Sequence, residues 1–450
     1  MGSLAAVREA LGTRCRVIDC AGATVLPGLI DPHLHLFGLA TREAHLDLGG
    51  RRRVADVLAA IRRHARALAP GAWVRAEGLD EHGLDRLPEA ADLDAVAPRN
   101  PVRLRHRSRH ASVLSGRGLT WLARRGLPLP AAERGLVIGR EAAISRAIGP
   151  LPARTLDRGL AAASTTLLAL GVTTVCDASP RSRADWAPLF RVARSGCFGP
   201  RVVAMRVPGT PRWTAASRVQ PGPVKILVDE GPEGMTPSPD RIARLVLQAA
   251  RRGDVVAVHC VGVATLAATL AAFAALPASL RRRPHRLEHV AECPPPLVRE
   301  IARLGLTVVT NPAFVYWRGE VYRDETPAAR RAWLYRARTL AAAGVPLAAG
   351  SDAPIVPPDP WRTMSAARTR RTRAGRTLGA GERLDARAAL ALITTGAAAA
   401  MGAPALGRLA PGCAADAIVV DGDPIARGPD AVAAIRPLLT VVGGRVAWEA

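Results

Sequence analysis

Two histidines and one lysine have residue types and surroundings that suggest chemistry. His33 and His35 are one residue apart in the segment PGLIDPHLHL, so on a β-strand both imidazoles would point to one face and could bind one metal ion. Lys225 is the only lysine among 62 lysine and arginine residues, and it lies in the aliphatic run VKILV. A buried lysine amine loses its proton readily, so it can act as a base, form a Schiff base or be carboxylated, whereas arginine cannot. Lys225 is therefore a candidate for amine chemistry.

Four more polar residues lie in or just after apolar runs that predict strands. They are Asp177 in VTTVCDAS, His259 in VVAVHC, His289 in HRLEHV and Asp352 in VPLAAGSDAP. If these strands are parallel neighbours, their carboxyl ends lie at one face of a sheet. The pattern therefore predicts that these side chains gather with His33, His35 and Lys225.

The elements that would position these residues alternate between strand and helix patterns from about residue 160 onward. Helices are predicted at about 241–252, 263–276 and 328–343, each between two predicted strands. This alternation indicates a parallel sheet, and the number of units favours an α/β fold of the (β/α)₈ TIM-barrel type over an open sheet. In such barrels the site is built at the carboxyl ends of the strands.

The motifs in their order resemble a known family. PGLIDPHLHL, followed by Lys225, His259, HRLEHV and GSDAP around Asp352, resembles the amidohydrolase superfamily and in detail its family 3, the YtcJ-like metal-dependent hydrolases. Further matching stretches are GVTTVCDAS at 171–179, VAVHCVGVATLAATL at 256–270 and GRLAPGCAADAIVVDGDP at 407–424. The resemblance covers nearly the whole chain.

The resemblance implies a domain organisation. A metal-dependent hydrolase barrel is expected at 29–395, with an insertion at about 40–150. A small β-sandwich domain is expected from both chain ends, 1–28 and 396–450. Residues 1–28 are shorter than the family pattern, so this part is expected to be truncated.

The resemblance also implies the site. His33 and His35 would bind a first metal ion, His259 and His289 a second position, and Lys225 would be carboxylated and bridge two ions. Asp352 would bind metal and, as the catalytic residue, move the proton. The cofactor is then one or two divalent ions, with zinc favoured. The expected reaction is attack of metal-bound hydroxide on a non-peptide C–N bond in an amide, formamide, carbamate or cyclic amide.

Two alternatives stay open at this point. One is a mononuclear amidohydrolase or deaminase in which Lys225 is not carboxylated. The other is a non-catalytic, arginine-rich barrel that binds a polyanion, suggested by a formal net charge of +24.

Substrate contacts are expected from His110, Asp177, Tyr316 and Trp317, and the stretch YWRGEVYRDE at 316–325 is typical of a loop that lines the substrate, although an interface would have the same composition. The remaining histidines are expected to be structural; they are His45, His64, His82, His106 and His285.

Composition limits the partners and the location. Aromatic residues are only 4% and are not interleaved with the arginine clusters, so nucleic acid is not favoured and a small-molecule substrate is. Seven scattered cysteines without a CxxC pair indicate free thiols in the cytoplasm. The run from Val255 to Leu280, uncharged apart from His259, contains Gly262 and Pro277, which fits a strand followed by a helix better than a membrane span. A homo-oligomer is left open.

Overall fold

The computed structural model describes Glu9 and residues 17–81, 84–106, 111–129, 133–215, 218–231 and 234–450. The chain divides into two compact units. The first unit comprises residues 1–36 and 163–450, and the second comprises residues 37–162. The second unit is therefore inserted, along the chain, into the first.

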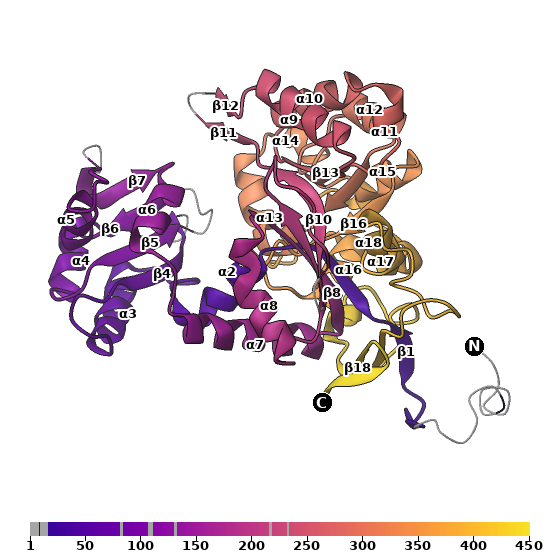
Figure 1. Cartoon of the computed structure of the whole chain (residues 1–450), viewed down its shortest axis with the longest axis horizontal. Helices are drawn as coiled ribbons and strands as arrows, with labels where there is room; N and C mark the ends of the chain where they lie inside the picture. The colour runs from indigo at the N-terminus through magenta and orange to yellow at the C-terminus, as the bar shows by residue number, and fades with distance from the viewer. Residues whose placement is uncertain are drawn as a thin grey trace. The chain divides into compact units, whose positions relative to one another are not determined.

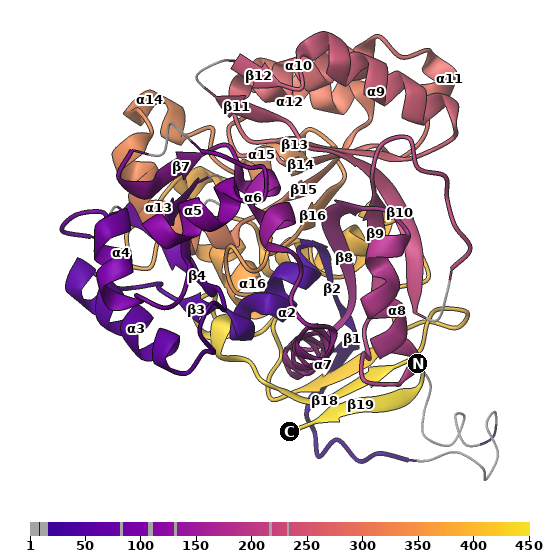
Figure 2. The same ribbon diagram turned by 60° about the vertical axis from the view of Figure 1, so that its left-hand side comes forward.

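The first unit contains an eight-stranded parallel sheet in the order β16, β15, β14, β13, β10, β9, β8, β2 (Figures 1 and 2). The main chain of His33 accepts a hydrogen bond from Asp352 N, and His35 N donates to Ala353 O, both at 2.7 Å. These bonds connect β2 to the segment after β16, so the sheet curves into a nearly closed barrel. The predicted (β/α)₈ barrel is confirmed. Its strands are β2 (Leu29–Leu34), β8 (Val172–Arg181), β9 (Arg201–Arg206), β10 (Val219–Ile226), β13 (Val256–Cys260), β14 (Arg286–His289), β15 (Thr307–Thr310) and β16 (Leu347–Ala349).

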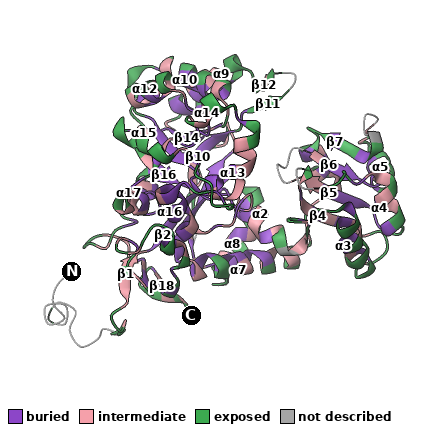
Figure 3. Cartoon of the chain, turned by 180° about the vertical axis from the view of Figure 1, so that it is seen from behind, coloured by how far each residue is buried: buried purple, intermediate pink, exposed green. Residues whose placement is uncertain are grey.

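Helices alternate with these strands and cover the outside of the barrel. Figure 3 shows the strands mostly buried, in purple, and the helices partly exposed, in green and pink. In α9 (Pro239–Arg251), the residues Ile242, Val246 and Ala249 recur at helical spacing and are buried, while the opposite side is polar. The other helices are α7 (Ala153–Ala169), α8 (Ala187–Arg194), α10 (Val263–Ala274), α11 (Ala278–Arg281), α12 (Pro295–Leu304), α13 (Ala313–Glu325), α14 (Ala328–Arg331), α15 (Ala337–Ala342), α16 (Pro360–Thr369), α17 (Ala386–Ala391) and α18 (Thr395–Ala400). A two-stranded ribbon, β11 (Asp229–Gly231) with β12 (Gly234–Thr236), follows β10.

The prediction of one continuous helix at 328–343 was wrong. It is two short helices, α14 and α15, because the segment between them is held by tertiary contacts. Leu334 forms an isolated β-bridge with Glu292, and Tyr335 N donates a hydrogen bond to Ala291 O. Tyr335 also has a left-handed φ of 48°. These bonds are incompatible with a continuous helix.

The loop interpretation of 316–325 was also wrong, because this stretch lies in α13. Val315 and Gly319 are buried one turn apart, and a Cβ at Gly319 would come within 2.3 Å of Thr372. The helix therefore packs closely against Thr372 at Gly319. The mixture of aromatic and charged residues in the sequence gives no sign of this packing.

Both chain ends contribute to one four-stranded antiparallel sheet in the order β1, β17, β18, β19. The prediction of a small β-domain formed from both ends is thereby confirmed. Its strands are β1 (Thr24–Pro27), β17 (Ala417–Val420), β18 (Pro437–Val442) and β19 (Arg445–Glu449).

The second unit is a five-stranded sheet in the order β3, β4, β5, β6, β7. One face packs Val74, Ala76 and Leu104 against Ile61 and Leu93 of two helices. Its elements are α2 (Leu36–Thr41), β3 (Leu46–Asp47), α3 (Val54–Arg66), β4 (Val74–Leu79), α4 (Ala90–Val96), β5 (Val102–His106), β6 (Ala111–Leu114), α5 (Gly116–Ala123), β7 (Leu136–Ile138) and α6 (Glu141–Ile148).

The uncharged run that follows Val255 forms β13 and α10, as expected. Among the helices of the described ranges, none combines the length and the apolar character that crossing a bilayer requires.

Candidate metal centre

Six side chains that the sequence singles out lie at the carboxyl ends of the barrel strands. This placement follows from the strand bounds, because each residue is near the last residue of its strand or just beyond it. They are His33 and His35 (β2), Lys225 (β10), His259 (β13), His289 (β14) and Asp352, which follows β16.

Three of these residues bring their ligand atoms within 4.8 Å of one another: His33, His35 and Asp352. Asp352 Oδ1 is 3.1 Å from His35 Nε2 and 3.5 Å from His33 Nε2. Although both are buried, His33 Nε2 and Asp352 Oδ1 have no hydrogen-bond partner among the described residues. Burying such groups without partners is costly, so the arrangement fits a cation bound between them.

Asp352 is ionised in this environment. Burial acts to raise the pKa of its carboxyl, but the imidazoles of His33, His35 and His289 hold that pKa well below its ordinary value. An ionised carboxylate beside two imidazoles is a donor set that zinc prefers.

His289 and His259 continue the same cluster. The ring centroid of His289 is 4.7 Å from that of His33 and 4.6 Å from that of His259. Burial lowers the pKa of His259 well below its ordinary value and that of His289 to about 4. Both imidazoles are therefore neutral at pH 7, which is the form that binds metal ions.

Lys225 lies among these imidazoles with only 1% of its surface exposed. Its charge acts on His33, His259 and His289. Burial lowers the pKa of its ammonium group, while the charges of Glu288 and Asp352 oppose this effect. A lowered pKa increases the fraction of neutral amine, which is the form that can react with carbon dioxide.

Sequence reasoning missed the residues that orient the imidazoles. His33 Nδ1 is hydrogen-bonded to Glu288 Oε2, and Glu288 is itself paired with Arg286, whose Nε lies 2.6 Å from Oε1. Burial acts to raise the pKa of Glu288, but Arg286 and His33 hold it well below its ordinary value. An ionised carboxylate can only accept, so His33 Nδ1 carries the proton and Nε2 keeps a free lone pair.

Asn311 fixes the tautomer of His289. Its Nδ2 donates to Gly350 O at 2.8 Å, so its Oδ1 accepts from His289 Nδ1 at 2.7 Å and leaves Nε2 of the ring free. Ser179 Oγ lies 2.8 Å from His35 Nδ1. Glu288 lies in the predicted strand segment HRLEHV and Asn311 follows the apolar run LTVV, but this pattern alone does not distinguish either residue from a solvent-facing polar residue.

Two buried aspartates hold the main chain around the site. Asp31 accepts from the backbone N–H groups of His33 and Ser351, each at 3.1 Å. Asp177, expected as a substrate contact, accepts from Leu36 N at 3.1 Å with one oxygen and from Ser179 N at 2.8 Å with the other. This geometry gives Asp177 a positioning role.

The backbone is strained at two of the candidate ligand positions. His289 has φ 70° and Asp352 has φ 58°, although neither is glycine. Left-handed conformations cost energy for most residues and concentrate at functional sites.

The chain matches the model of the Amidohydrolase family over residues 16–447. The chain belongs to the amidohydrolase family. The resemblance stated from the motifs is therefore confirmed, and this amidohydrolase is a hydrolase like the other members.

Two curated relatives align with the whole chain. The YtcJ protein of Bacillus subtilis is 26% identical, and the alignment covers 100% of this chain and 93% of that protein. The N-substituted formamide deformylase of Arthrobacter pascens is 27% identical with the same coverage of 100% and 93%. Among solved structures, a metal-dependent hydrolase of Pyrococcus horikoshii OT3 has a TM-score of 0.77 at 23% identity, covering 94% of this chain and 91% of that one. This last likeness supports the fold.

The remaining predicted substrate contacts stay predictions in this amidohydrolase. His110 lies outside the described residues. The guanidinium of Arg362 lies 4.2 Å from the centre of the Tyr316 ring, and that of Arg373 lies 5.4 Å from the Trp317 ring. Both contacts are cation–π pairs, and a role in substrate binding stays a prediction.

Glu288→Gln tests the orientation of His33. A neutral amide can present N–H to His33 Nδ1 and leaves the Arg286 charge uncompensated in the interior. We expect zinc affinity to fall about 10–100-fold and the free energy of unfolding to fall by about 3–5 kcal/mol. Chelator competition measures the first quantity and equilibrium denaturation the second.

Glu300→Gln is the matched control, because Glu300 pairs with Arg303 at the surface of α12 and its loss should change neither quantity measurably. A folded Glu288→Gln variant that binds zinc as tightly as the wild type would contradict the orienting role.

Proposed function

We propose that this amidohydrolase hydrolyses a non-peptide C–N bond in a small molecule. N-substituted formamides are the first substrates to test, because a relative that aligns along the full chain is named for that reaction. Amides, carbamates and cyclic amides share the same chemistry. The observation that carries the proposal is the pair of buried atoms His33 Nε2 and Asp352 Oδ1, which lie 3.5 Å apart and have no hydrogen bond among the described residues.

Divalent ions, with zinc favoured, would be held by His33, His35 and Asp352 and by the neighbouring His259 and His289. The unpartnered donor atoms, the neutral imidazoles and the ionised carboxylate fit such ions. A bound zinc-class ion lowers the pKa of a water ligand to about 7 and polarises the carbonyl under attack.

We assign Asp352 the proton transfer. Its carboxylate is ionised and stands among the ligands, so it can take a proton from the attacking water and return it to the leaving nitrogen. Glu288 and Asn311 would keep the imidazoles of His33 and His289 in the tautomer that exposes Nε2.

We propose that Lys225 is carboxylated. The low exposure and lowered pKa of its amine support the reaction, and the carbamate would replace a buried cation by an anion with two oxygens. Two oxygens can bind two ions, so this proposal predicts a binuclear centre.

A single-ion centre is the second candidate. It is favoured by the observation that, among the histidines and the aspartate of this cluster, the one group of three whose donor atoms all lie within 4.8 Å of one another is His33, His35 and Asp352. Metal content per chain separates the two candidates.

The test combines metal analysis with an assay. The purified chain is expected to hold about two zinc ions, to release an amine from N-substituted formamides, to lose this activity on treatment with a strong chelator and to regain it with zinc. Activity that survives complete metal removal would contradict the metal-dependent mechanism. No turnover on a panel of formamides, amides, carbamates and cyclic amides, together with tight and salt-sensitive polyanion binding, would favour the non-catalytic alternative.

We also propose a cytoplasmic location. The six cysteines in the described part of the chain are free thiols, which supports a reducing compartment.

A further inference from the structure

The five-stranded sheet of the second unit has a charged face. β4 and β5 direct alternate residues into the apolar core, so the residues between them point to the opposite face. In the parallel register of these strands, Arg75 lies opposite Arg103 and Glu77 lies opposite Arg105. Like charges placed directly opposite each other destabilise a strand pair, so Arg75 and Arg103 need negative charge nearby.

The acidic residues on this face pair with cationic residues other than Arg75. Glu141 of α6 is paired with Arg103, and its Oε2 lies 3.2 Å from Arg105 Nε. Glu77 Oε1 lies 3.0 Å from His45 Nδ1 and 3.6 Å from a terminal nitrogen of Arg105. Each carboxylate therefore has two cationic or potentially cationic neighbours.

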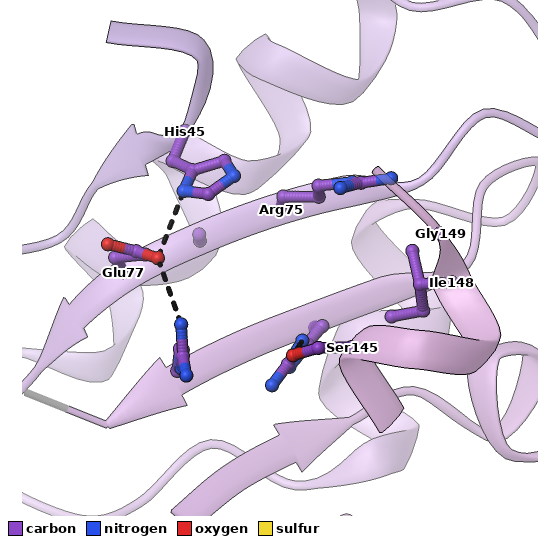
Figure 4. Close-up of a pocket in the computed structure, with 9 residues that line it drawn as sticks. His45, Arg75, Glu77, Ser145, Ile148 and Gly149 are labelled. Carbon is purple, nitrogen blue, oxygen red and sulfur yellow. Dashed lines mark hydrogen bonds and ion pairs between the residues drawn. The ribbon is translucent and has the colours of Figure 1, made fainter. Parts of the chain in front are cut away.

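Arg75 has no hydrogen bond, ion pair or ring partner among the described residues, and it is only half-buried. Burial, and then the charge of Arg103, lowers the pKa of its guanidinium, as expected for a buried cation without a counter-charge. Figure 4 shows its side chain on the same face as Glu77 and Ser145; the dashed contacts there run from Glu77 to His45 and to a nitrogen-bearing side chain on the adjacent strand.

A cavity of about 90 Å³ opens over this face, and its polar lining is formed by His45, Arg75, Glu77, Arg103, Arg105 and Ser145. That volume is well above the roughly 10–15 Å³ that one water molecule requires. It is large enough for a charged functional group and too small for a folded partner.

We propose that this pocket binds a small oxyanion, a carboxylate or a phosphate, through Arg75. The planar guanidinium presents paired N–H donors that match two oxygens of either group. The anion would supply the negative charge that Arg75 lacks, since the carboxylate of Glu141 is paired with Arg103. All residues that line the pocket belong to the second unit.

Titration calorimetry on the full-length chain tests the proposal, with inorganic phosphate and acetate as separate probes at constant ionic strength. Prior chelation removes the metal ions, so that phosphate bound to them does not contribute. We expect Arg75→Gln to weaken binding of the preferred probe about tenfold or more, because one charge-assisted contact is lost. Arg75→Lys should bind with intermediate affinity. The probe that binds with the higher affinity shows whether the natural ligand carries a phosphate or a carboxylate group.

Arg62→Gln is the matched control, since Arg62 is exposed on α3, and it should bind as the wild type does. Without the anion, Arg75→Gln should be at least as thermally stable as the wild type, because a like-charge pair is removed. Equal binding by the wild type and Arg75→Gln would overturn the proposal, as would the absence of binding of either probe after chelation. A Gln variant with a lower melting temperature in chloride would also overturn it.

Discussion

Replacing Lys225 by arginine is expected to lower the zinc content from about two ions to one or fewer per chain and to reduce kcat by about a thousandfold or more. A guanidinium cannot be carboxylated, so the variant keeps a cation beside His33, His259 and His289, which Lys225 influences electrostatically. Metal ions supply several kcal/mol of transition-state stabilisation, and each 1.36 kcal/mol corresponds to a factor of ten in rate. Plasma mass spectrometry and the formamide assay measure the two effects.

Carboxylation itself can be separated from a general effect of the substitution. Wild-type protein reconstituted with zinc in buffer depleted of carbon dioxide should gain activity slowly, and bicarbonate should accelerate the gain; Lys225→Arg should show no such response. In Lys225→Ala the lost carbamate leaves space, so short carboxylic acids should restore part of the activity. Two zinc ions per Lys225→Arg chain, or a wild type indifferent to bicarbonate, would rule out the carbamate bridge.

The barrel and the placement of its polar residues could be predicted because both depend on local patterns. Apolar runs of strand length mark the strands, and in a parallel barrel their carboxyl ends meet at one face. His259, His289 and Asp352 each stand near the end of such a run, so the spacing along the chain was enough to place them together. The closure of the barrel next to His33 then follows from the strand order.

The contacts that orient the ligands could not be predicted, because they join residues far apart in the sequence. Glu288 reaches His33 from another strand, and nothing local distinguishes it from a solvent-facing glutamate in an alternating strand. Asn311 is a similar case, since its role depends on the carbonyl of Gly350 fixing its amide. The position of Arg75 opposite Arg103 depends on which strands are neighbours in the sheet, and β4 and β5 are separated in the sequence by a helix.

The burial of α13 illustrates a different limit. Tyr316 and Trp317 among charged residues suggested a substrate-lining loop, but arginines from later in the chain lie against both rings. Tertiary contacts of this kind override a weak local pattern, so the helix becomes visible only in the folded chain.

Asp352→Asn is expected to reduce kcat by about 10²–10⁴-fold, the range of general acid–base catalysis, with a much smaller change in KM. The amide cannot carry the proton from the attacking water to the leaving nitrogen, and it is a poorer metal ligand. Asp359→Asn is the matched control. Asp359 caps α16 through Oδ1, which accepts from Trp361 N and Arg362 N, and asparagine caps a helix equally well. The Asp359→Asn variant should therefore keep the activity of the wild type.

The nature of the leaving group separates the two roles of Asp352. A substrate that releases a weakly basic aniline needs little protonation of nitrogen, whereas one that releases an alkylamine needs it before the C–N bond breaks. If Asp352 moves the proton, Asp352→Asn should lose distinctly more activity on N-alkylformamides than on formanilides at equal zinc content. If it acts only as a ligand, the loss should be the same for both substrates and should follow zinc occupancy. Equal losses at full zinc occupancy would therefore remove the proton-transfer role from Asp352 and require a different acid for the leaving amine.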